Sequence, residues 1–474
     1  MDSAKVLSIF QEITKIPRES GHEAPMTAFL QAFAAERGLA CKTDAIGNVC
    51  ISKEAAKGKE GVPTLALQGH QDMVCEKRAG YVHDFQKDPI RYVIEDGWMI
   101  AKDTTLGADD GIGVAAMLAL LDSDLKTGRL ECIFTVSEET GMDGAFAMEP
   151  GFFTGRTLIN LDSEDEGQLF IGCAGGVDTF ARFRYVPEDR RADFDTVQLR
   201  IGGAMGGHSG DDINKGRMNT IQQMARFLYS ELGREFQLIV LKGGNKPNAI
   251  ARDCEAKLSV PDIPGIVERF KAFGAQVRQE YAKTDPGVTF EAEAFRCTEK
   301  PIQSGVARKL ITALYACPHG VEAMSPDIPG LVETSTNLAS VRMRNLGEVE
   351  VVTSQRSSVS SAKDMMAGKV EANFKLAGAV VEHAFAYPGW KPDMDSPILK
   401  VCFDSYKKLF GVEPEVKAIH AGLECGLFAE KFGDLDMISF GPTLRGVHAP
   451  GERLELASLD KFVKHLADVV TNYR

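Results

Sequence analysis

The sequence lacks a long apolar run and an excess of basic residues. No stretch approaches the roughly 18 apolar residues of a membrane span, and the first 20 residues carry scattered charges instead of a signal peptide's apolar core. Lys and Arg number 54 against 67 Asp and Glu, so the formal net charge is −13. Nucleic acids and anionic membranes favour a basic face. We therefore expect a soluble, cytoplasmic protein with neither kind of partner.

Closely spaced cysteine pairs are also absent. The ten cysteines include no Cys-x-x-Cys spacing, which is typical of buried thiols in a reducing compartment, and no disulfide framework is expected. The hydrophobic content of 44% and the charged content of 26% are ordinary for a globular protein. A length of 474 residues exceeds one hydrophobic core, so at least two domains are predicted.

Helices and strands alternate at both ends of the chain. Apolar spacing predicts helices over residues 4–16, 24–37, 111–121 and 458–472. Strands are expected at "NVCIS", "TLALQGH", "RLECIFT" and "TLIN", and near residues 416–420 and 436–440. This alternation predicts an α/β fold whose sheet is covered on both faces.

The middle of the chain has a different rhythm. Residues 187–296 predict strand, helix, strand, strand, helix and strand, with helices near 215–232 and 263–283. Residues 304–386 repeat this order without the opening strand, and residues 386–397 form a Pro-rich linker. We therefore expect two domains. An α/β domain of residues 1–186 and 392–474 carries an inserted α+β domain, residues 187–391, built from two similar halves.

Potential metal ligands follow several strands of the first domain. They are His70, Asp72, Asp109, Asp110, Glu138, Glu139, Asp162 and His448. Loops at the carboxyl ends of the strands converge in an open α/β sheet, and several acids there would repel one another without cations. Mixed imidazole and carboxylate groups suit Zn²⁺, Co²⁺ or Mn²⁺ better than Ca²⁺.

Each of these residues also has an ordinary structural interpretation. A single His at a strand end is usually a satisfied polar group, and the pair Glu138–Glu139 is typical of a solvated turn. The segment "LGADDGIG" fits a tight turn into a helix and lacks the spacings of nucleotide-binding loops. Only the coincidence of these residues at strand ends favours a metal site.

The sequence resembles the M20 metallopeptidase family along essentially its whole length, and most closely the bacterial dipeptidases of that family. The resemblance rests on nine segments in the expected order: "GHQDMV", "LGADDGIG", "SEETGMDGA", "NLDSEDEG", "GGHSGDDI", "KPNAIAR", "SQRSS", "HAGLECG" and "GVHAPGE". No segment departs from the family pattern at a ligand position. The resemblance implies a catalytic domain that binds metal and an inserted lid domain.

The resemblance also assigns the metal ligands. Asp109 would bridge two divalent ions, normally zinc, for which cobalt or manganese can substitute. His70 and Asp162 would complete one site, and Glu139 and His448 would complete the other. Each ion would keep an open position for water or substrate, as in other catalytic sites.

Three further residues would support catalysis in such an enzyme. Asp72 would hold the second ring nitrogen of His70 and so fix the tautomer. Glu138 would act as the general base on the attacking water and pass the proton to the leaving amine. His208 of the lid would stabilise the oxyanion, either within one chain or across a homodimer. The resemblance also implies a cis peptide bond between Asp109 and Asp110.

The substrate's carboxy end would contact the lid. Asn248, Arg356 and Gly422 match positions that bind it, and Arg356 would grip a free carboxylate with two prongs. Without the resemblance, Arg356 would be read as a strand-surface arginine. We expect hydrolysis of unblocked L-dipeptides, including those that end in histidine. An M20-type N-acyl-amino-acid amidohydrolase and an inactive metal-binding scaffold remain as alternatives, and the sequence leaves the oligomeric state open.

Overall fold

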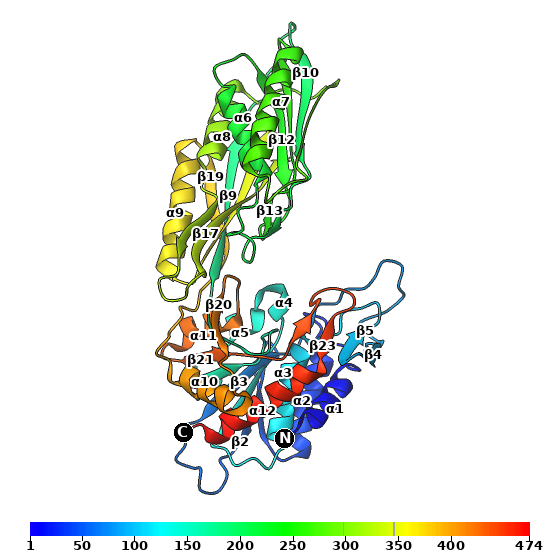
Figure 1. Cartoon of the computed structure of the whole chain (residues 1–474), viewed down its shortest axis with the longest axis vertical. Coiled ribbons are helices and arrows are strands. Elements are labelled where there is room, and N and C mark those ends of the chain that lie inside the picture. Colours follow the sequence, from blue (N-terminus) through cyan, green and yellow to red (C-terminus); the bar gives the residue numbers. More distant parts are fainter. Residues whose placement is uncertain (297, 345–346) are drawn as a thin grey trace. The chain divides into compact units, whose positions relative to one another are not determined.

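The computed structural model describes residues 1–296, 298–344 and 347–474, which divide into two compact units (Figure 1). Unit 1 comprises Met1–Gly172, Trp390–Ala418 and Leu423–Arg474, and unit 2 comprises Cys173–Gly389 and Ile419–Gly422. None of the helices among these described residues is long and apolar enough to cross a membrane. None of the nine cysteines that the structure describes forms a disulfide bond.

Unit 1 combines one large sheet with surrounding helices. Its helices are α1 (Ser3–Ile13), α2 (Ala24–Glu36), α3 (Ala108–Leu121), α4 (Glu138–Gly141), α5 (Asp143–Ala147), α10 (Pro397–Phe410), α11 (Glu424–Phe432) and α12 (Leu456–Asn472). Its strands are β1 (Ala40–Thr43), β2 (Val49–Lys53), β3 (Leu65–His70), β4 (Tyr92–Glu95), β5 (Trp98–Ala101), β6 (Leu130–Thr135), β7 (Thr157–Asn160), β8 (Gln168–Cys173), β20 (Glu415–Ile419), β21 (Asp436–Ser439), β22 (Leu444–Arg445) and β23 (Arg453–Glu455). The four helices expected in this part of the chain are confirmed as α1, α2, α3 and α12.

The large sheet has eight strands in the order β1-β2-β6-β3-β7-β21-β8-β20. The central strands β6, β3, β7 and β21 run parallel, and every residue of β3, β6 and β7 is buried. Strands buried on both faces carry nearly continuous apolar runs, which explains why "LALQGH" and "LECIFT" do not alternate. Helix α3 packs against β3 and α10 against β21. This parallel centre places several carboxyl strand ends at one edge of the sheet.

The described residues of unit 2 form one large sheet, a two-stranded sheet of β11 and β13, and four helices. The helices are α6 (Thr220–Ser230), α7 (Ile263–Glu280), α8 (Ser304–Ala316) and α9 (Ser360–Leu376). The strands are β9 (Gly175–Arg184), β10 (Asp195–Gly202), β11 (Gly207–His208), β12 (Gln237–Gly244), β13 (Ala249–Ile250), β14 (Cys254–Val260), β15 (Thr289–Ala294), β16 (Gly320–Met324), β17 (Val332–Arg344), β18 (Glu348–Ser357) and β19 (Val380–Tyr387). Helix α6 begins at Thr220, later than the expected residue 215, because the Asn219 side chain caps it by accepting from the N–H groups of Ile221 and Gln222.

The sheet of unit 2 is built from two halves with the same strand arrangement. Its order is β15-β10-β14-β12-β17-β18-β9-β19, with β16 added beside β17. In the first half, the last strand in sequence, β15, lies at the outer edge beside the first strand, β10. In the second half, the last strand, β19, lies at the opposite edge beside β9. The opening strand missing from the second half is therefore β9, which precedes residue 187. Because β9 pairs with β18 and β19, unit 2 begins at Cys173 and not at the expected residue 187.

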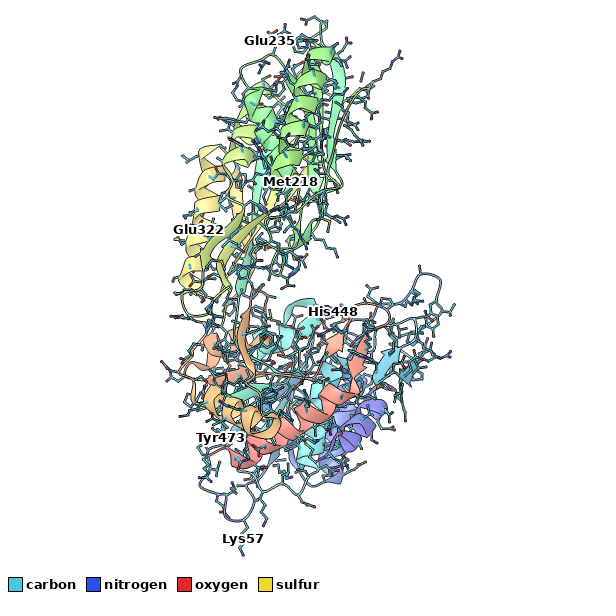
Figure 2. The ribbon with its side chains drawn as sticks, viewed as in Figure 1. Lys57, Met218, Glu235, Glu322, His448 and Tyr473 are labelled. Carbon is cyan, nitrogen blue, oxygen red and sulfur yellow. The ribbon has the colours of Figure 1, made fainter. Side chains whose placement is uncertain are left out.

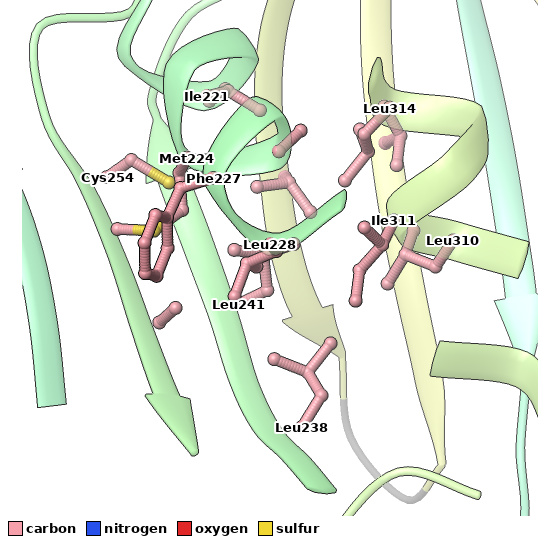
Figure 3. Close-up of a cluster of buried hydrophobic side chains, with 14 of the residues drawn as sticks. Ile221, Met224, Phe227, Leu228, Leu238, Leu241, Cys254, Leu310, Ile311 and Leu314 are labelled. Carbon is pink, nitrogen blue, oxygen red and sulfur yellow. The ribbon is translucent and has the colours of Figure 1, made fainter. Parts of the chain in front are cut away.

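All four helices of unit 2 contribute to one hydrophobic cluster with the sheet. Figure 3 shows Met224 and Leu228 of α6 near Leu241 of β12, with Leu310 and Leu314 of α8 beside them. Each of these side chains is at most 1% exposed, and burial of such a side chain contributes roughly 1.5–3 kcal/mol. The expected substrate-binding residues Asn248, Arg356 and Gly422 are not part of this cluster.

Candidate active site

Three neighbouring parallel strands of unit 1 end in residues that can bind metal. His70 is the last residue of β3, and β6 leads through Val136 and Ser137 into Glu138 and Glu139. Asp162 follows two residues after the end of β7. Because β6, β3 and β7 are adjacent and parallel, these side chains meet at one edge of the sheet.

Asp109 lies between two imidazoles and presents a different oxygen to each. Its Oδ1 is 2.9 Å from Nε2 of His70, and its Oδ2 is 3.1 Å from Nε2 of His448. His448 lies on the loop between β22 and β23 (Figure 2) and also contacts Glu139 Oε2 at 2.9 Å. The peptide bond between Asp109 and Asp110 is cis, as the resemblance implies. Asp110 itself faces the start of α3, where its Oδ1 accepts from the Gly113 N–H at 3.1 Å.

These residues form three overlapping groups whose ligand atoms lie within 4.8 Å of one another. The groups are His70 with Asp109 and Asp162, Asp109 with Glu139 and His448, and His70 with Glu138 and Glu139. Asp109 belongs to the first two groups, as a bridging ligand would. The donor set of imidazole nitrogens and carboxylate oxygens fits Zn²⁺, Co²⁺ or Mn²⁺.

The electrostatics of the cluster also favour bound cations. Hydrogen bonds to Asp109 and Glu139 raise the pKa of His448 to about 11. Burial raises the pKa of the Glu138 carboxyl well above its ordinary value, and the nearby charges of Glu424 and Glu139 add to this effect, although His70 opposes it. Burial and the charge of Asp109 likewise raise the pKa of Asp162. Acids that resist ionisation in this environment are stabilised as carboxylates by positive charge.

Asp72 connects the His70 ring with the Glu138–Glu139 segment. Its Oδ1 lies 3.3 Å from Nδ1 of His70, at ion-pair distance. The same carboxylate accepts hydrogen bonds from the backbone N–H groups of Glu138 at 3.1 Å and Glu139 at 3.2 Å, and from the Ser20 hydroxyl at 2.7 Å. Asp72 is fully buried. Its position fits the expected role beside His70 and adds a second role that the sequence did not predict.

Two buried charged side chains, those of Glu452 and Arg18, hold the loop that carries Asp109. The Glu452 carboxylate accepts hydrogen bonds from the N–H groups of Leu106, Gly107 and Ala108 at 2.7–3.0 Å. The Arg18 guanidinium donates to the carbonyl groups of Asp72 and Gly107. Gly107 has a φ of +68°, and a Cβ there would lie 2.4 Å from Arg18 Nη2, so only glycine fits this position. These contacts tie the Asp109 loop to the loop after β3.

A row of buried, hydrogen-bonded polar side chains, here called the polar ladder, crosses the central strands of the sheet. It includes Gln68, two residues before His70, and Asn160, two residues before Asp162. Gln68 of β3 stands opposite Asn160 of β7, and Asn160 stands opposite Ser439 of β21. Asn160 Nδ2 donates to Gln68 Oε1 at 2.7 Å, and Ser439 Oγ donates to Asn160 Oδ1 at 2.5 Å. At one end, Glu424 Oε2 accepts from Gln68 Nε2 at 2.5 Å and from Thr135 Oγ1 at 2.7 Å. The ladder therefore cross-links the strands that present His70, Glu138 and Asp162.

The remaining site residues predicted from the sequence lie in unit 2. His208 on β11 pairs with Ala249 on β13, and the Ser209 N–H donates to the Asn248 carbonyl at 2.9 Å. Backbone N–H of Gly210 donates to His208 Nδ1 at 3.3 Å. The structure thus brings His208 on β11 close to Asn248, which directly precedes β13.

Arg356 and Gly422 form a second group in unit 2. Arg356 Nη1 donates to the His420 carbonyl and to the Tyr387 hydroxyl, both at 3.4 Å. A Cβ on Gly422 would lie 2.9 Å from the Tyr387 ring. His420 and Gly422 belong to the short segment Ile419–Gly422, which joins unit 2 although its neighbours in the sequence lie in unit 1. A Cβ on Gly210 would lie 2.5 Å from the His420 carbonyl, so the His208 loop adjoins this segment.

Sequence reasoning did not single out several of these residues. Glu424 and Glu452 fall within the quoted segments "HAGLECG" and "GVHAPGE", and their burial is the signal that only the structure supplies. Tyr387 was placed in a linker over residues 386–397, whereas it is the last residue of β19. Nothing in the segment "KIPRES" around Arg18 indicates that its side chain is buried.

Comparisons with known proteins agree with this arrangement. The profile of "Peptidase family M20/M25/M40" matches residues 66–472. The chain is 36% identical over 466 residues to the cytosol non-specific dipeptidase of Escherichia coli strain K12, covering 98% of this chain and 96% of that protein. It matches the crystal structure of aminoacylhistidine dipeptidase from Vibrio alginolyticus with a TM-score of 0.92 and 37% identity, over 99% of this chain and 97% of that one.

A more distant structure shares the fold. The aminopeptidase PepT from Bacillus cereus matches with a TM-score of 0.59 over 99% of this chain and 98% of that one, and its 16% identity restricts this likeness to the fold. The family profile, these relatives and the fold with its catalytic and lid domains lead to one conclusion. The chain belongs to the metal-dependent peptidase family M20/M25/M40.

Proposed function

We propose that the protein is a metal-dependent dipeptidase that hydrolyses unblocked L-dipeptides, including those that end in histidine. The observation that carries this proposal is the position of Asp109 between His70 and His448, with Glu138 in the same cluster. The E. coli and V. alginolyticus relatives, which are a cytosol non-specific dipeptidase and an aminoacylhistidine dipeptidase, support the substrate class.

Five residues would hold two divalent metal ions, and their imidazole and carboxylate groups suit such ions in charge and in donor type. His70 and Asp162 would bind one ion, Glu139 and His448 would bind the other, and Asp109 would bridge them. We propose zinc, for which cobalt or manganese can substitute, because the donors are imidazole and carboxylate groups. When bound, such ions polarise a peptide carbonyl and activate a water molecule.

Glu138 would move the proton during hydrolysis. A general base must accept a proton from the attacking water and return it to the leaving amine. The hydrogen bonds from the Glu138 and Glu139 N–H groups to Asp72 fix the backbone on which the base stands. Glu139 would then bind metal, and its neighbour Glu138 would accept the proton of the attacking water. His208 would stabilise the negative charge that develops on the carbonyl oxygen.

Arg356 would recognise the free carboxylate of the dipeptide, together with Asn248 and the Gly422 segment. Arg356 is 8% exposed, its Nε has no hydrogen-bond partner, and no ion pair to it occurs among the described residues. Asp178 and Asp211 interact with the Arg356 charge without forming a direct ion pair to it. A bound carboxylate would give the buried guanidinium a charged partner at hydrogen-bond distance. An amidated substrate would present a neutral group to this charge.

The substrate assay must separate the dipeptidase from an N-acyl-amino-acid amidohydrolase. We expect the protein, loaded with zinc or cobalt, to hydrolyse alanyl-histidine much faster than N-acetylhistidine or N-acetyl-alanyl-histidine. A chelator should abolish this turnover, and added metal should restore it. Faster hydrolysis of N-acetylhistidine would favour the amidohydrolase, and absence of any hydrolysis after reloading would favour a scaffold. We also propose a cytoplasmic location, supported by the E. coli relative and testable by cell fractionation.

A further inference from the structure

Tyr387 and Arg356 lie in one row that crosses four strands of the unit 2 sheet. The register places Ser335 of β17 opposite Arg356 of β18, Arg356 opposite Gly176 of β9, and Gly176 opposite Tyr387 of β19. Arg356 and Tyr387 are thus two strand spacings apart, about 9.6 Å between their backbones. Because Gly176 has no side chain, they reach over it, and Arg356 Nη1 lies 3.4 Å from the Tyr387 hydroxyl.

The Tyr387 ring is held between two glycines. A Cβ on Gly176 would lie 2.6 Å from the ring and its hydroxyl, and a Cβ on Gly422 would lie 2.9 Å from the ring. The pairing of β19 with β9 also shifts register between Ala384 and Tyr387, and Phe385 within this bulge has a φ of 54°. Bulges of this kind redirect a side chain next to a functional site. Backbone and packing therefore both determine where this phenol lies.

The hydroxyl of Tyr387 has an unused donor. A phenol can accept hydrogen bonds and donate one, and this hydroxyl accepts from Arg356 Nη1. Within residues 1–296, 298–344 and 347–474, no acceptor for its own proton is found. Burial raises the pKa of the Tyr387 hydroxyl, so it keeps that proton at neutral pH. Together with the unpartnered Arg356 Nε, the hydroxyl gives the row two free donors, which suits an anion with more than one oxygen.

We propose that Tyr387 determines specificity for the free carboxy end, by donating its hydroxyl proton in a hydrogen bond to the substrate carboxylate that Arg356 binds. This inference rests on the proposed dipeptidase function and adds a residue to its substrate-binding site. A carboxylate accepts from both the guanidinium and the phenol. A carboxamide has only one acceptor oxygen and turns N–H groups toward these donors, which leaves buried polar groups unpaired.

The test compares alanyl-histidine with alanyl-histidinamide in wild-type enzyme and in Tyr387→Phe, which removes only the hydroxyl. We expect the variant to lose about 10–100-fold in kcat/KM on the free dipeptide, mainly through KM, because a hydrogen bond to a charged group is lost. Its kcat/KM on the amide should change little, so the preference for the free dipeptide should fall by the same factor. Gly176→Ala should reduce the preference too, since the new methyl group displaces the ring tip.

Tyr315→Phe is the matched control, because Tyr315 is a partly exposed tyrosine of α8 that stacks on Tyr229. It should keep the wild-type preference, and thermal melting should show that all variants are folded. If the wild type hydrolyses alanyl-histidine and Tyr387→Phe retains the full preference, the assignment of Tyr387 is overturned while the dipeptidase function stands. Equal hydrolysis of both substrates by the wild type also overturns it. If the wild type hydrolyses no dipeptide, the proposed function itself fails.

Discussion

Asp72 accepts a hydrogen bond from the backbone N–H of Glu138 over 3.1 Å. The carboxylate that faces His70 therefore also holds the backbone of the proposed general base. A single buried residue links the metal ligand at the end of β3 to the turn at the end of β6, and so couples metal binding to the placement of the base.

Replacement of Asp72 by alanine should affect both functions. We expect Asp72→Ala to lower metal affinity or turnover by about 10–100-fold, the usual cost of losing a group that orients a metal-binding His. Ser20→Ala, which removes one hydrogen bond to Asp72 Oδ2 and leaves the carboxylate in place, should have a much smaller effect. Metal titration and steady-state kinetics of both variants would check this. Wild-type affinity and turnover in Asp72→Ala would refute the coupling.

Glu138→Gln should separate proton transfer from metal binding. The amide keeps the size of the side chain but cannot carry the proton, so turnover should fall by about 10²–10⁴-fold. Elemental analysis should still find two metal equivalents per chain. Activity above a tenth of the wild-type value would show that Glu138 is not the base.

Glu139→Ala should instead reduce the metal content itself, because it removes a proposed ligand that contacts His448. Glu149→Ala, a change at an exposed glutamate nearby in the sequence, is the matched control and should retain full occupancy. The measurement is metal content after dialysis against dilute zinc. Two full equivalents in Glu139→Ala would mean that the roles of Glu138 and Glu139 have been exchanged.

The parallel centre of unit 1 and its helices could be predicted because their apolar patterns are local. The ends of β3, β6 and β7 were recognisable since ionisable residues interrupt buried runs. In the structure, His70 and His448 each contact Asp109. The beginning of unit 2 was misplaced because β9 follows β8 after a single residue, Ala174, with no change in composition. Only its pairing with β18 shows to which sheet it belongs.

The residues that position the site were harder to predict because they act through long-range contacts. Glu452 caps the Asp109 loop from more than 340 positions away in the sequence, and Glu424 meets Gln68 from 356 positions away. Tyr387 lies in a Pro-rich segment, and its orientation depends on a bulge and on the absence of side chains at Gly176 and Gly422. Periodicity and propensity contain no information on such contacts.

Glu424 should be important as a hydrogen-bond acceptor. Burial raises its pKa to about 7, so a neutral side chain of the same shape suits the position. Glu424→Ala would leave Gln68 Nε2 and Thr135 Oγ1 without this buried acceptor and should destabilise the protein by about 1–3 kcal/mol. Glu424→Gln keeps an acceptor oxygen and should cost less. Chemical denaturation of both variants measures their free energies of unfolding. An equal decrease in the two variants would show that the hydrogen bonds from Gln68 and Thr135 to Glu424 do not contribute to stability.

His465 should make the protein less stable in mild acid. Its side chain is 3% exposed on α12, and its Nε2–H donates to the Cys402 carbonyl at 2.9 Å. Burial lowers its pKa from 6.5 to about 4 in the folded protein. The unfolded chain therefore takes up the proton first as the pH falls, so the stabilising contribution is complete above pH 6.5 and is lost toward pH 4.

At pH 5 these pKa values correspond to a loss of about 2 kcal/mol relative to neutral pH. His465→Gln retains an N–H donor but cannot be protonated, so its free energy of unfolding should fall less between pH 7.5 and 5 than that of the wild type. His22→Gln, at an exposed histidine, should follow the wild type. Urea unfolding of the three metal-free proteins at both pH values measures the difference, with metal removed because His70 and His448 would otherwise release it in the same range. If His465→Gln loses as much stability as the wild type, the buried imidazole does not determine the acid sensitivity.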